Sequence, residues 1–488
     1  MNKKIIPQFL GPLFFLAILF FFHPTGLSPE ANAVLACTVW IAIWWIFEVT
    51  DIAVTALLPI ILFPLTSALS IADTTAAYGH KYIFLYMGGF ILAITIEKWN
   101  LHKRIALSII TILGAKISRI ILGFMLATAF MSMWISNTAT AVMMLPIGLA
   151  IIKQLKDHPS TPENEHELFG KALMLAIAYS ASIGGMATLF GTPPNLVLAG
   201  VVEEIYDINI SFSQWIKFGL PISIILLAIC WLYLTRIAFS FKFEEFPGGS
   251  NEIKRLLREL GQWSIEEKRV LVVFVLTAFF LIFRKWFAQF VPQLDDTIIA
   301  MTAGILLFLL PSGNGKDQLI NWKEAVKMPW GVILLFGGGM ALASGFQQSG
   351  LASWIGNQFG LLNELPILLL VLIIIAAVNL LTEITSNMAT AAMLLPILAP
   401  MALVLDVHPY LLMAAATVAA SCAFMLPVAT PPNAIVFGSG YLKIPDMVKT
   451  GIWMNIISII ILTIAVYFFL GYLWGFDPSS YPSNWMTK

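Results

Sequence analysis

Charged residues are scarce in this chain, and so are residues that bind metals or form disulfides. Only 11% of its 488 residues are Asp, Glu, Lys or Arg, whereas a soluble protein carries about a quarter. The three cysteines, Cys37, Cys230 and Cys422, stand singly in apolar segments without metal-ligand spacing, which favours small hydrophobic residues over a disulfide or zinc framework. These absences argue against a soluble or disulfide-stabilised protein.

Apolar residues make up 59% of the chain and gather in long runs. Runs of about 18 residues or more are long enough to cross a bilayer as helices. They predict an all-α polytopic membrane protein with about 11 transmembrane helices. The expected spans are residues 5–22, 33–49, 53–69, 82–99, 172–195, 214–233, 270–290, 297–310, 331–349, 409–437 and 452–474.

A polar motif occurs twice, 250 residues apart, and gives the chain its internal symmetry. The copies at residues 136–147 and 386–397 are identical at nine of twelve positions, and both begin with Ser-Asn. A Thr-Pro-Pro-Asn sequence follows each copy, at 192–195 and at 430–433, and a glycine pair at 88–89 recurs at 338–339. A long internal repeat that carries one polar motif within apolar surroundings is typical of secondary transporters.

Each Ser-Asn motif lies in the middle of an apolar segment, at 120–153 and 366–404. We interpret each segment as two half-length helices that meet at a polar tip, which is a re-entrant hairpin. The consecutive prolines should open the helices at 193–194 and 431–432, because proline lacks a backbone donor and clashes with the preceding turn. Each repeat holds five complete spans, an odd number, so an inverted-topology repeat is expected.

The distribution of basic residues predicts the orientation. With a cytoplasmic N-terminus and an external C-terminus in the cell inner (plasma) membrane, all but five of the 27 Lys and Arg fall on the inner side. The exceptions are Lys81, Lys217, Arg284, Lys285 and Lys488. The first apolar run, 5–22, is long for a signal peptide and is expected to remain as a span.

The hairpin tips and the proline breaks predict a binding site near the middle of the membrane. Unpaired polar groups are costly in hydrocarbon and persist only where they line a cavity or are buried in protein. Helix N-termini favour an anion, whereas freed carbonyls near Gly191 and Ala429 can coordinate a small hard cation. The expected anion donors are Ser136, Asn137, Thr138, Ser386, Asn387, Thr430 and Asn433.

No Lys, Arg or His lies in these four motifs, so bound cations are expected to balance a dianion. No serine there has a base to activate it, and no catalytic residue or enzyme is expected. Small and hydroxyl-bearing residues also pack helices together, but two copies in register favour a site. We expect close helix contacts at the glycine pairs. Glu383, three residues before Ser386, is expected to brace the second hairpin rather than bind a cation or proton directly.

The paired Ser-Asn tips and Thr-Pro-Pro-Asn breaks resemble the divalent anion:sodium symporter family over nearly the whole chain. The resemblance implies Na⁺-coupled import of a divalent anion, with a C4-dicarboxylate (succinate, fumarate or malate) ahead of citrate or sulfate. A sodium-independent dicarboxylate exchanger is the alternative, and a membrane enzyme or passive channel is the rival from another class. The implied partners are a small dianion, membrane lipid and a second copy of the chain, and no nucleic acid.

The resemblance also implies an elevator-type mechanism. Its scaffold would comprise residues 1–117 and a linker and second part at 237–361, its transport domain 118–236 and 362–474, and its tail 475–488. By motif position, the family's substrate contacts fall on Ser136, Asn137, Thr138, Ser386, Asn387, Thr430 and Pro431. Its first sodium site falls on Ser132, Ser136, Asn137 and Gly191, and its second on Thr382, Thr385, Asn387 and Ala429. Met388 departs from the pattern, since the second motif often has Thr there.

Overall fold

The computed structural model describes residues 5–114, 116–157, 163–241, 249–313, 315, 317–358 and 365–485, and this part of the chain is helical. Outside it lie Lys3, Lys4, part of the predicted linker (242–248) and the last three residues of the predicted tail, Lys488 included.

The first half contains α1 (Ile5–Phe21), α2 (Pro29–Ile46), α3 (Ile52–Thr55), α4 (Leu58–Leu65), α5 (Ile71–Ala76), η1 (Ala77–Gly79), α6 (Lys81–Lys98), α7 (Leu101–Leu113), α8 (Ile117–Ser132), α9 (Asn137–Asp157), α10 (Glu163–Gly185), α11 (Pro193–Tyr206), α12 (Phe212–Leu232) and the π-helical η2 (Tyr233–Ala238). The second half contains α13 (Gly249–Glu259), α14 (Ile265–Ile282), α15 (Arg284–Phe287), α16 (Asp296–Leu309), α17 (Trp322–Ala325), α18 (Trp330–Gln348), α19 (Leu351–Gln358), α20 (Ile367–Thr382), α21 (Asn387–Val404), α22 (Pro409–Ala420), α23 (Pro431–Phe437), α24 (Ile444–Ile464), the π-helical η4 (Ala465–Leu470), α25 (Gly471–Trp474) and η5 (Ser483–Trp485).

Eight helices within the described residues are long and apolar enough to cross a membrane. Further apolar helices of 10–17 residues include the first arm of each hairpin, Ile117–Ser132 and Ile367–Thr382, and the helix before the second break, Pro409–Ala420. The prediction of an all-α polytopic membrane protein is therefore confirmed. The expected span at 53–69 is wrong in detail, because α3 and α4 are separate short helices. Pro59 lies in the first turn of α4, where proline is tolerated but cannot continue a helix from α3.

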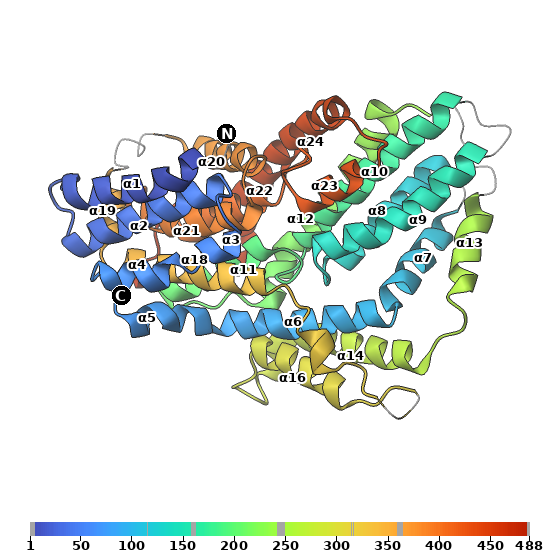
Figure 1. Cartoon of the computed structure of the whole chain (residues 1–488), viewed down its shortest axis with the longest axis horizontal. Coiled ribbons are helices and arrows are strands. Elements are labelled where there is room, and N and C mark those ends of the chain that lie inside the picture. Colours follow the sequence, from blue (N-terminus) through green and yellow to red (C-terminus); the bar gives the residue numbers. More distant parts are fainter. Residues whose placement is uncertain are drawn as a thin grey trace.

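Both predicted hairpins are present. In the first, α8 ends at Ser132 and α9 begins at Asn137, and in the second α20 ends at Thr382 and α21 begins at Asn387. The two pairs extend toward opposite ends of the molecule's long axis, with α8 and α9 on the right of Figure 1 and α20 and α21 on the left. The two repeated Ser-Asn motifs thus form the tips of two equivalent hairpins.

The Thr-Pro-Pro-Asn sequences interrupt two long helical segments as predicted. The first break separates α10 from α11, and the second separates α22 from α23. In both cases the threonine, Thr192 or Thr430, is the N-cap in an extended conformation and the two prolines form the first turn of the new helix. Proline is well accommodated there, since its missing N–H is one that a first turn leaves unpaired anyway.

The two halves pack reciprocally. In each half the hairpin packs on its own broken span, through α8 and α9 with α10, and through α20 and α21 with α22. Across the halves, α11 packs on α21 while α23 packs on α9. This exchange of equivalent helices is what a two-fold relation between the repeats requires, and it brings both tips and both breaks together.

The remaining helices form the surroundings of this core, and the glycine pairs allow two of them to approach closely. A Cβ on Gly88 of α6 would lie 2.5 Å from the backbone of Ala300 on α16. A Cβ on Gly338 of α18 would lie 2.5 Å from the backbone oxygen of Ala56. The predicted role of both pairs in close helix contacts is confirmed at these positions.

Candidate substrate and sodium sites

One cavity of about 910 Å³ lies where the two tips and the two breaks meet. All seven residues predicted to contact substrate line it, namely Ser136, Asn137, Thr138, Ser386, Asn387, Thr430 and Pro431. The two halves of the repeat therefore form a single site, although their motifs are 250 residues apart in the chain. This is the size of a typical small-molecule site.

The other wall of the cavity comes from helices outside the repeat motifs. One face of α6 contributes Tyr86, Phe90, Ala93, Ile94 and Glu97, which recur at helical spacing. The connection from α2 to α3 and the start of α18 complete this wall. The cavity is thus polar on the side of the tips and largely apolar on the side of α6.

A cluster of oxygen atoms lies directly behind the first tip. The hydroxyl of Ser132 lies 2.5 Å from the side-chain amide of Asn137 and donates to the backbone oxygen of Ala181 at 2.7 Å. The amide of Asn137 fits its surroundings in two orientations. In one, its oxygen faces the backbone oxygens of Ala181 and Gly191 at 3.1 Å, and in the other its nitrogen donates to both.

The second tip has an equivalent cluster. The hydroxyl of Thr382 lies 2.7 Å from Oδ1 of Asn387 and donates to the backbone oxygen of Ala420 at 3.0 Å. Thr382 and Asn387 are the positions that correspond to Ser132 and Asn137 in the repeat, and Ala429 lines the same cavity. Thr385 also lines the cavity, but its hydroxyl contacts Leu381 and Thr390 within its own hairpin.

These two clusters have the chemistry of a sodium site. Each combines a hydroxyl, an amide oxygen and carbonyl oxygens freed by a broken helix, which are the ligands that transporters use for Na⁺. In the oxygen-facing orientation of Asn137, its amide oxygen would join the backbone oxygens of Ala181 and Gly191 around one point, whereas in the other orientation its nitrogen donates to both. By contrast, the described residues contain no group of three or more His, Cys, Asp or Glu that could hold a metal.

Two asparagines shape the breaks rather than the cavity wall. The side-chain nitrogen of Asn195 donates to the backbone oxygen of Thr188 at 2.7 Å. Asn433, its counterpart, donates to the backbone oxygens of Ala423 at 3.2 Å and Leu426 at 3.0 Å. Asn433 is fully buried and does not line the cavity, so its prediction as an anion donor is wrong. The nitrogen of its side-chain amide is already bonded within the loop that it stabilises.

Glu383 is expected from the sequence to brace the second hairpin, and its carboxylate connects that hairpin to the second break. Its carboxylate accepts hydrogen bonds from the backbone N–H groups of Phe424 at 2.7 Å, Met425 at 3.0 Å and Leu426 at 3.0 Å. The side chain of Asn455 on α24 donates to the same carboxylate at 2.7 Å. With four donors around it, this buried carboxylate holds the loop that carries the second oxygen cluster.

In the first half, uncharged groups support the break. Met133 occupies the position that corresponds to Glu383, and its backbone oxygen accepts from the hydroxyl of Thr188 at 2.5 Å. That hydroxyl in turn accepts from the backbone N–H of Gly191 at 3.1 Å. The two breaks therefore have similar shapes but different supports.

Three charged side chains at the cavity wall could not be found from the repeated motifs. Glu48, Glu97 and Lys327 line the cavity from the α2–α3 connection, the end of α6 and the segment before α18. Lys327 is the basic side chain in the described lining. None of the three belongs to a repeated motif, so only the fold indicates that they face the site.

The sequence model of the "Sodium:sulfate symporter transmembrane region" matches residues 2–475. The chain belongs to this sodium:sulfate symporter family. Membership indicates that the protein is a transporter, and it confirms the resemblance drawn from the doubled motifs. The protein is thus a multi-pass membrane transporter.

Similar curated proteins cover almost the whole chain. A sodium-dependent dicarboxylate transporter, SdcS, of Staphylococcus saprophyticus is 47% identical over 481 residues, covering 97% of this chain and 93% of the relative. SdcS of Staphylococcus aureus (strain USA300) is 48% identical over 483 residues, covering 97% and 92%. Both alignments therefore extend over both halves of the repeat.

Two solved structures support the architecture at lower identity. The YdaH transporter of Alcanivorax borkumensis superposes with a TM-score of 0.56 at 14% identity, over 84% of this chain and 88% of its own. MtrF of Neisseria gonorrhoeae, described with a class of antimetabolite efflux pumps, gives 0.58 at 13% identity and covers 94% of both chains. At these identities the likeness concerns the fold alone.

Proposed function

We propose that this protein imports a C4-dicarboxylate, such as succinate, fumarate or malate, together with Na⁺. The observation that carries the proposal is the meeting of both Ser-Asn tips and both breaks at one cavity, with an oxygen cluster behind each tip. The names of the 47–48% identical relatives support the same substrate class and the same coupling ion.

The dianion would be held by helix ends and uncharged donors. The helices α9, α11 and α21 all begin at the cavity, where Asn137, Pro193 and Asn387 line it. The first turn of a helix has free N–H groups and a partial positive charge, which favour a carboxylate. The hydroxyls of Ser136, Thr138, Ser386 and Thr430 would add donors, and Pro431 would contact the carbon chain.

Sodium would supply the countercharge that the motifs lack. The first ion would be bound by Ser132, Ser136, Asn137 and Gly191, and the second by Thr382, Thr385, Asn387 and Ala429. Because Asn137 and Asn387 face both an oxygen cluster and the cavity, a bound ion would orient the amide whose nitrogen contacts the substrate. Two ions moving with one dianion would be electroneutral, and a further ion would add about 2.3 kcal/mol per 100 mV.

Met388 supports a carbon substrate over sulfate. It lines the cavity next to Asn387, where it replaces a potential hydroxyl donor with an apolar side chain. A dicarboxylate has a methylene or vinyl segment that can contact such a side chain, whereas sulfate exposes only oxygens.

The structure represents a state open toward the cytoplasm in this proposal. The cavity extends along α6 to Glu97, beside the basic residues Lys98 and Lys103. Basic residues mark the cytoplasmic side, which agrees with a cytoplasmic N-terminus and an external C-terminus in the inner membrane. The transport domain, 118–236 with 362–474, would move as an elevator against the scaffold of a homodimer surrounded by lipid.

Uptake of labelled succinate into proteoliposomes tests the proposal. Uptake should require an inward sodium gradient and saturate with succinate. Uptake that proceeds without sodium, and only when dicarboxylate is preloaded inside, would identify an exchanger instead. Competition by fumarate, malate, citrate and sulfate would then order the substrates.

A further inference from the structure

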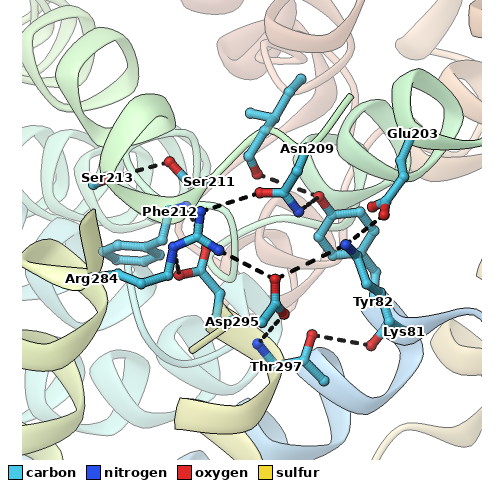
Figure 2. Close-up of polar contacts among 12 residues, drawn as sticks. Lys81, Tyr82, Glu203, Asn209, Ser211, Phe212, Ser213, Arg284, Asp295 and Thr297 are labelled. Carbon is cyan, nitrogen blue, oxygen red and sulfur yellow. Dashed lines mark hydrogen bonds and ion pairs between the residues drawn. The ribbon is translucent and has the colours of Figure 1, made fainter. Parts of the chain in front are cut away.

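A dense polar cluster lies at the start of α6, around Lys81 and Tyr82 (Figure 2). Glu97 lines the cavity near the end of α6, whereas Lys81 and Tyr82 begin the same helix. The separation of 16 residues between Lys81 and Glu97 corresponds to about 24 Å of α-helix. In the proposed cytoplasm-open state, the cluster therefore lies on the outer side of the substrate site.

Several contacts of this cluster join the connection from α11 to α12 with α6 and α16. Nζ of Lys81 lies 2.5 Å from Oε1 of Glu203 near the end of α11. The side-chain nitrogen of Asn209 donates to the hydroxyl of Tyr82 at 3.1 Å. The backbone N–H of Phe212, the first residue of α12, donates to Oδ2 of Asp296 at 2.7 Å. These bonds connect the predicted transport domain to the predicted scaffold.

Other contacts position the charged groups within the predicted scaffold. Arg284 lies 3.2 Å from Oδ2 of Asp295 and 3.3 Å from Oδ1 of Asp296. Asp296 is only 2% exposed, so its carboxylate depends on Arg284 and on the N–H of Phe212 for compensation. Separating α12 from α16 would remove one of these two partners.

The cluster also contains two of the five basic residues that break the charge rule. Of the five Lys and Arg expected on the outer side, Lys81 and Arg284 are paired here with acidic residues of other segments. A cation that is paired with a carboxylate does not count as a free positive charge in the rule that orients membrane proteins. The presence of Lys81 and Arg284 on the outer side is explained instead by the contacts across the domain boundary.

We propose that this cluster forms the closed outer gate of the transporter. The gate residues are Lys81, Tyr82, Glu203, Asn209, Phe212, Arg284, Asp295 and Asp296. The inference rests on the proposed transport function, because alternating access requires one side of the site to be closed while the other is open. The contacts between Lys81 and Glu203, Asn209 and Tyr82, and Phe212 and Asp296 hold this state. They must separate before a dianion can enter from outside.

The gate is suited to repeated opening. The side chains of Lys81 and Glu203 are 37% and 18% exposed, so water can solvate both when they part. Partly exposed ion pairs shift an equilibrium modestly, by about threefold on average. Weakening one pair should therefore change the balance between states without unfolding the protein.

Thiol labelling from either side of the membrane tests the gate without reference to any substrate. A Val428→Cys reporter suits this purpose, because Val428 lines the cavity and is 80% exposed, while Cys37, Cys230 and Cys422 are buried. In oriented vesicles, a membrane-impermeant maleimide should label the reporter mainly from the cytoplasmic side. Adding Lys81→Gln or Glu203→Gln should raise outer-side labelling by about threefold, and the charge exchange Lys81→Glu with Glu203→Lys should restore the original value.

Lys171→Gln is the matched control. Lys171 and Asp446 form an ion pair of 3.0 Å with similar exposure, but both lie within the predicted transport domain, on α10 and α24. Its removal should leave outer-side labelling unchanged. Equal labelling in the gate variants and the parent, or an equal rise in the control, would overturn the gate. A failure of sodium-dependent succinate uptake would instead count against the proposed function and would leave the labelling result intact.

A reversible crosslink gives a second test that does not depend on weakening the fold. In a Lys81→Cys, Glu203→Cys variant, a short bis-methanethiosulfonate reagent should connect α6 to α11. The crosslink should stop transport, and reduction should restore it. Transport that continues in the fully crosslinked protein would refute the gate.

Discussion

The hydroxyl of Ser132 lies 2.5 Å from the side-chain amide of Asn137, at the point where α8 ends and α9 begins. Ser132→Ala would remove one oxygen from the first cluster and leave the rest in place. Losing one such contact at a buried site costs about 1.4 kcal/mol, or about tenfold in affinity. We therefore expect the sodium concentration for half-maximal uptake to rise about tenfold.

Ser180→Ala controls for the loss of a buried hydroxyl near that cluster. Ser180 is fully buried on α10, and its hydroxyl donates to the backbone oxygen of Ala176 within the same helix. The control should keep the parental sodium dependence. An equal sodium dependence in Ser132→Ala and Ser180→Ala would remove Ser132 from the sodium site.

Gly185→Ala tests whether the first tip must hold Asn137 in its present position. A Cβ at residue 185 would lie 2.5 Å from Oδ1 of Asn137, so the amide would have to move. Such overpacking costs about 1–3 kcal/mol, and uptake should fall by about an order of magnitude. Gly79→Ala, where a Cβ would meet no atom within 4 Å, should transport normally. Normal uptake by Gly185→Ala would show that the amide is free to move.

Glu383→Gln tests the support of the second break. The amide would present donors to the N–H groups of Phe424, Met425 and Leu426, which now donate to the carboxylate. Hydrogen bonds to a charged group contribute about 1.5–3 kcal/mol each, so the apparent unfolding temperature of purified protein should fall and sodium affinity should weaken. Glu259→Gln, at an exposed position, should change neither. Parental stability in Glu383→Gln would argue against this bracing role.

Met388→Thr tests the basis of selectivity. A hydroxyl at this position would add a donor to the cavity wall beside Asn387 and remove an apolar contact. We expect sulfate to inhibit succinate uptake more strongly in the variant, with a smaller apparent inhibition constant. If the sulfate inhibition curves of variant and parent coincide, residue 388 does not select the substrate.

Lys327→Gln tests the basic side chain of the opposite wall. Lys327 lines the cavity, whereas Lys323 lies on the exposed side of α17 and does not. Removing the charge should raise KM for succinate presented on the cavity side by about threefold, with little change in kcat, and high salt should reduce the difference. Lys323→Gln provides the control. A change in kcat alone would assign Lys327 a role other than attracting the dianion.

The polar half of the site could be predicted from sequence because it is repeated. The Ser-Asn tips and the proline breaks each appear twice in register, and the cost of unpaired polar groups in hydrocarbon leaves few places for them. Spacing does not determine where a side chain points, however. Asn433 shares its motif with Thr430 but donates to Ala423 and Leu426 instead of facing the cavity.

The other half of the site could not be predicted, because tertiary packing alone creates it. Tyr86 and Phe90 read as ordinary residues of an apolar span, and Lys327 reads as one basic residue in a loop. Nothing local indicates that α6 and the start of α18 face the tips. The support of Glu383 by Asn455 is likewise a contact over 72 residues, and the break between α3 and α4 has only Pro59 as a local signal.

Binding of labelled succinate to the purified protein, titrated with Na⁺, tests the central claim most directly. The account predicts saturable binding that requires Na⁺ and that disappears in Asn137→Ala and in Asn387→Ala, while both variants remain folded by size-exclusion chromatography. Succinate binding of equal affinity in sodium-free buffer, or parental binding in both variants, would contradict it.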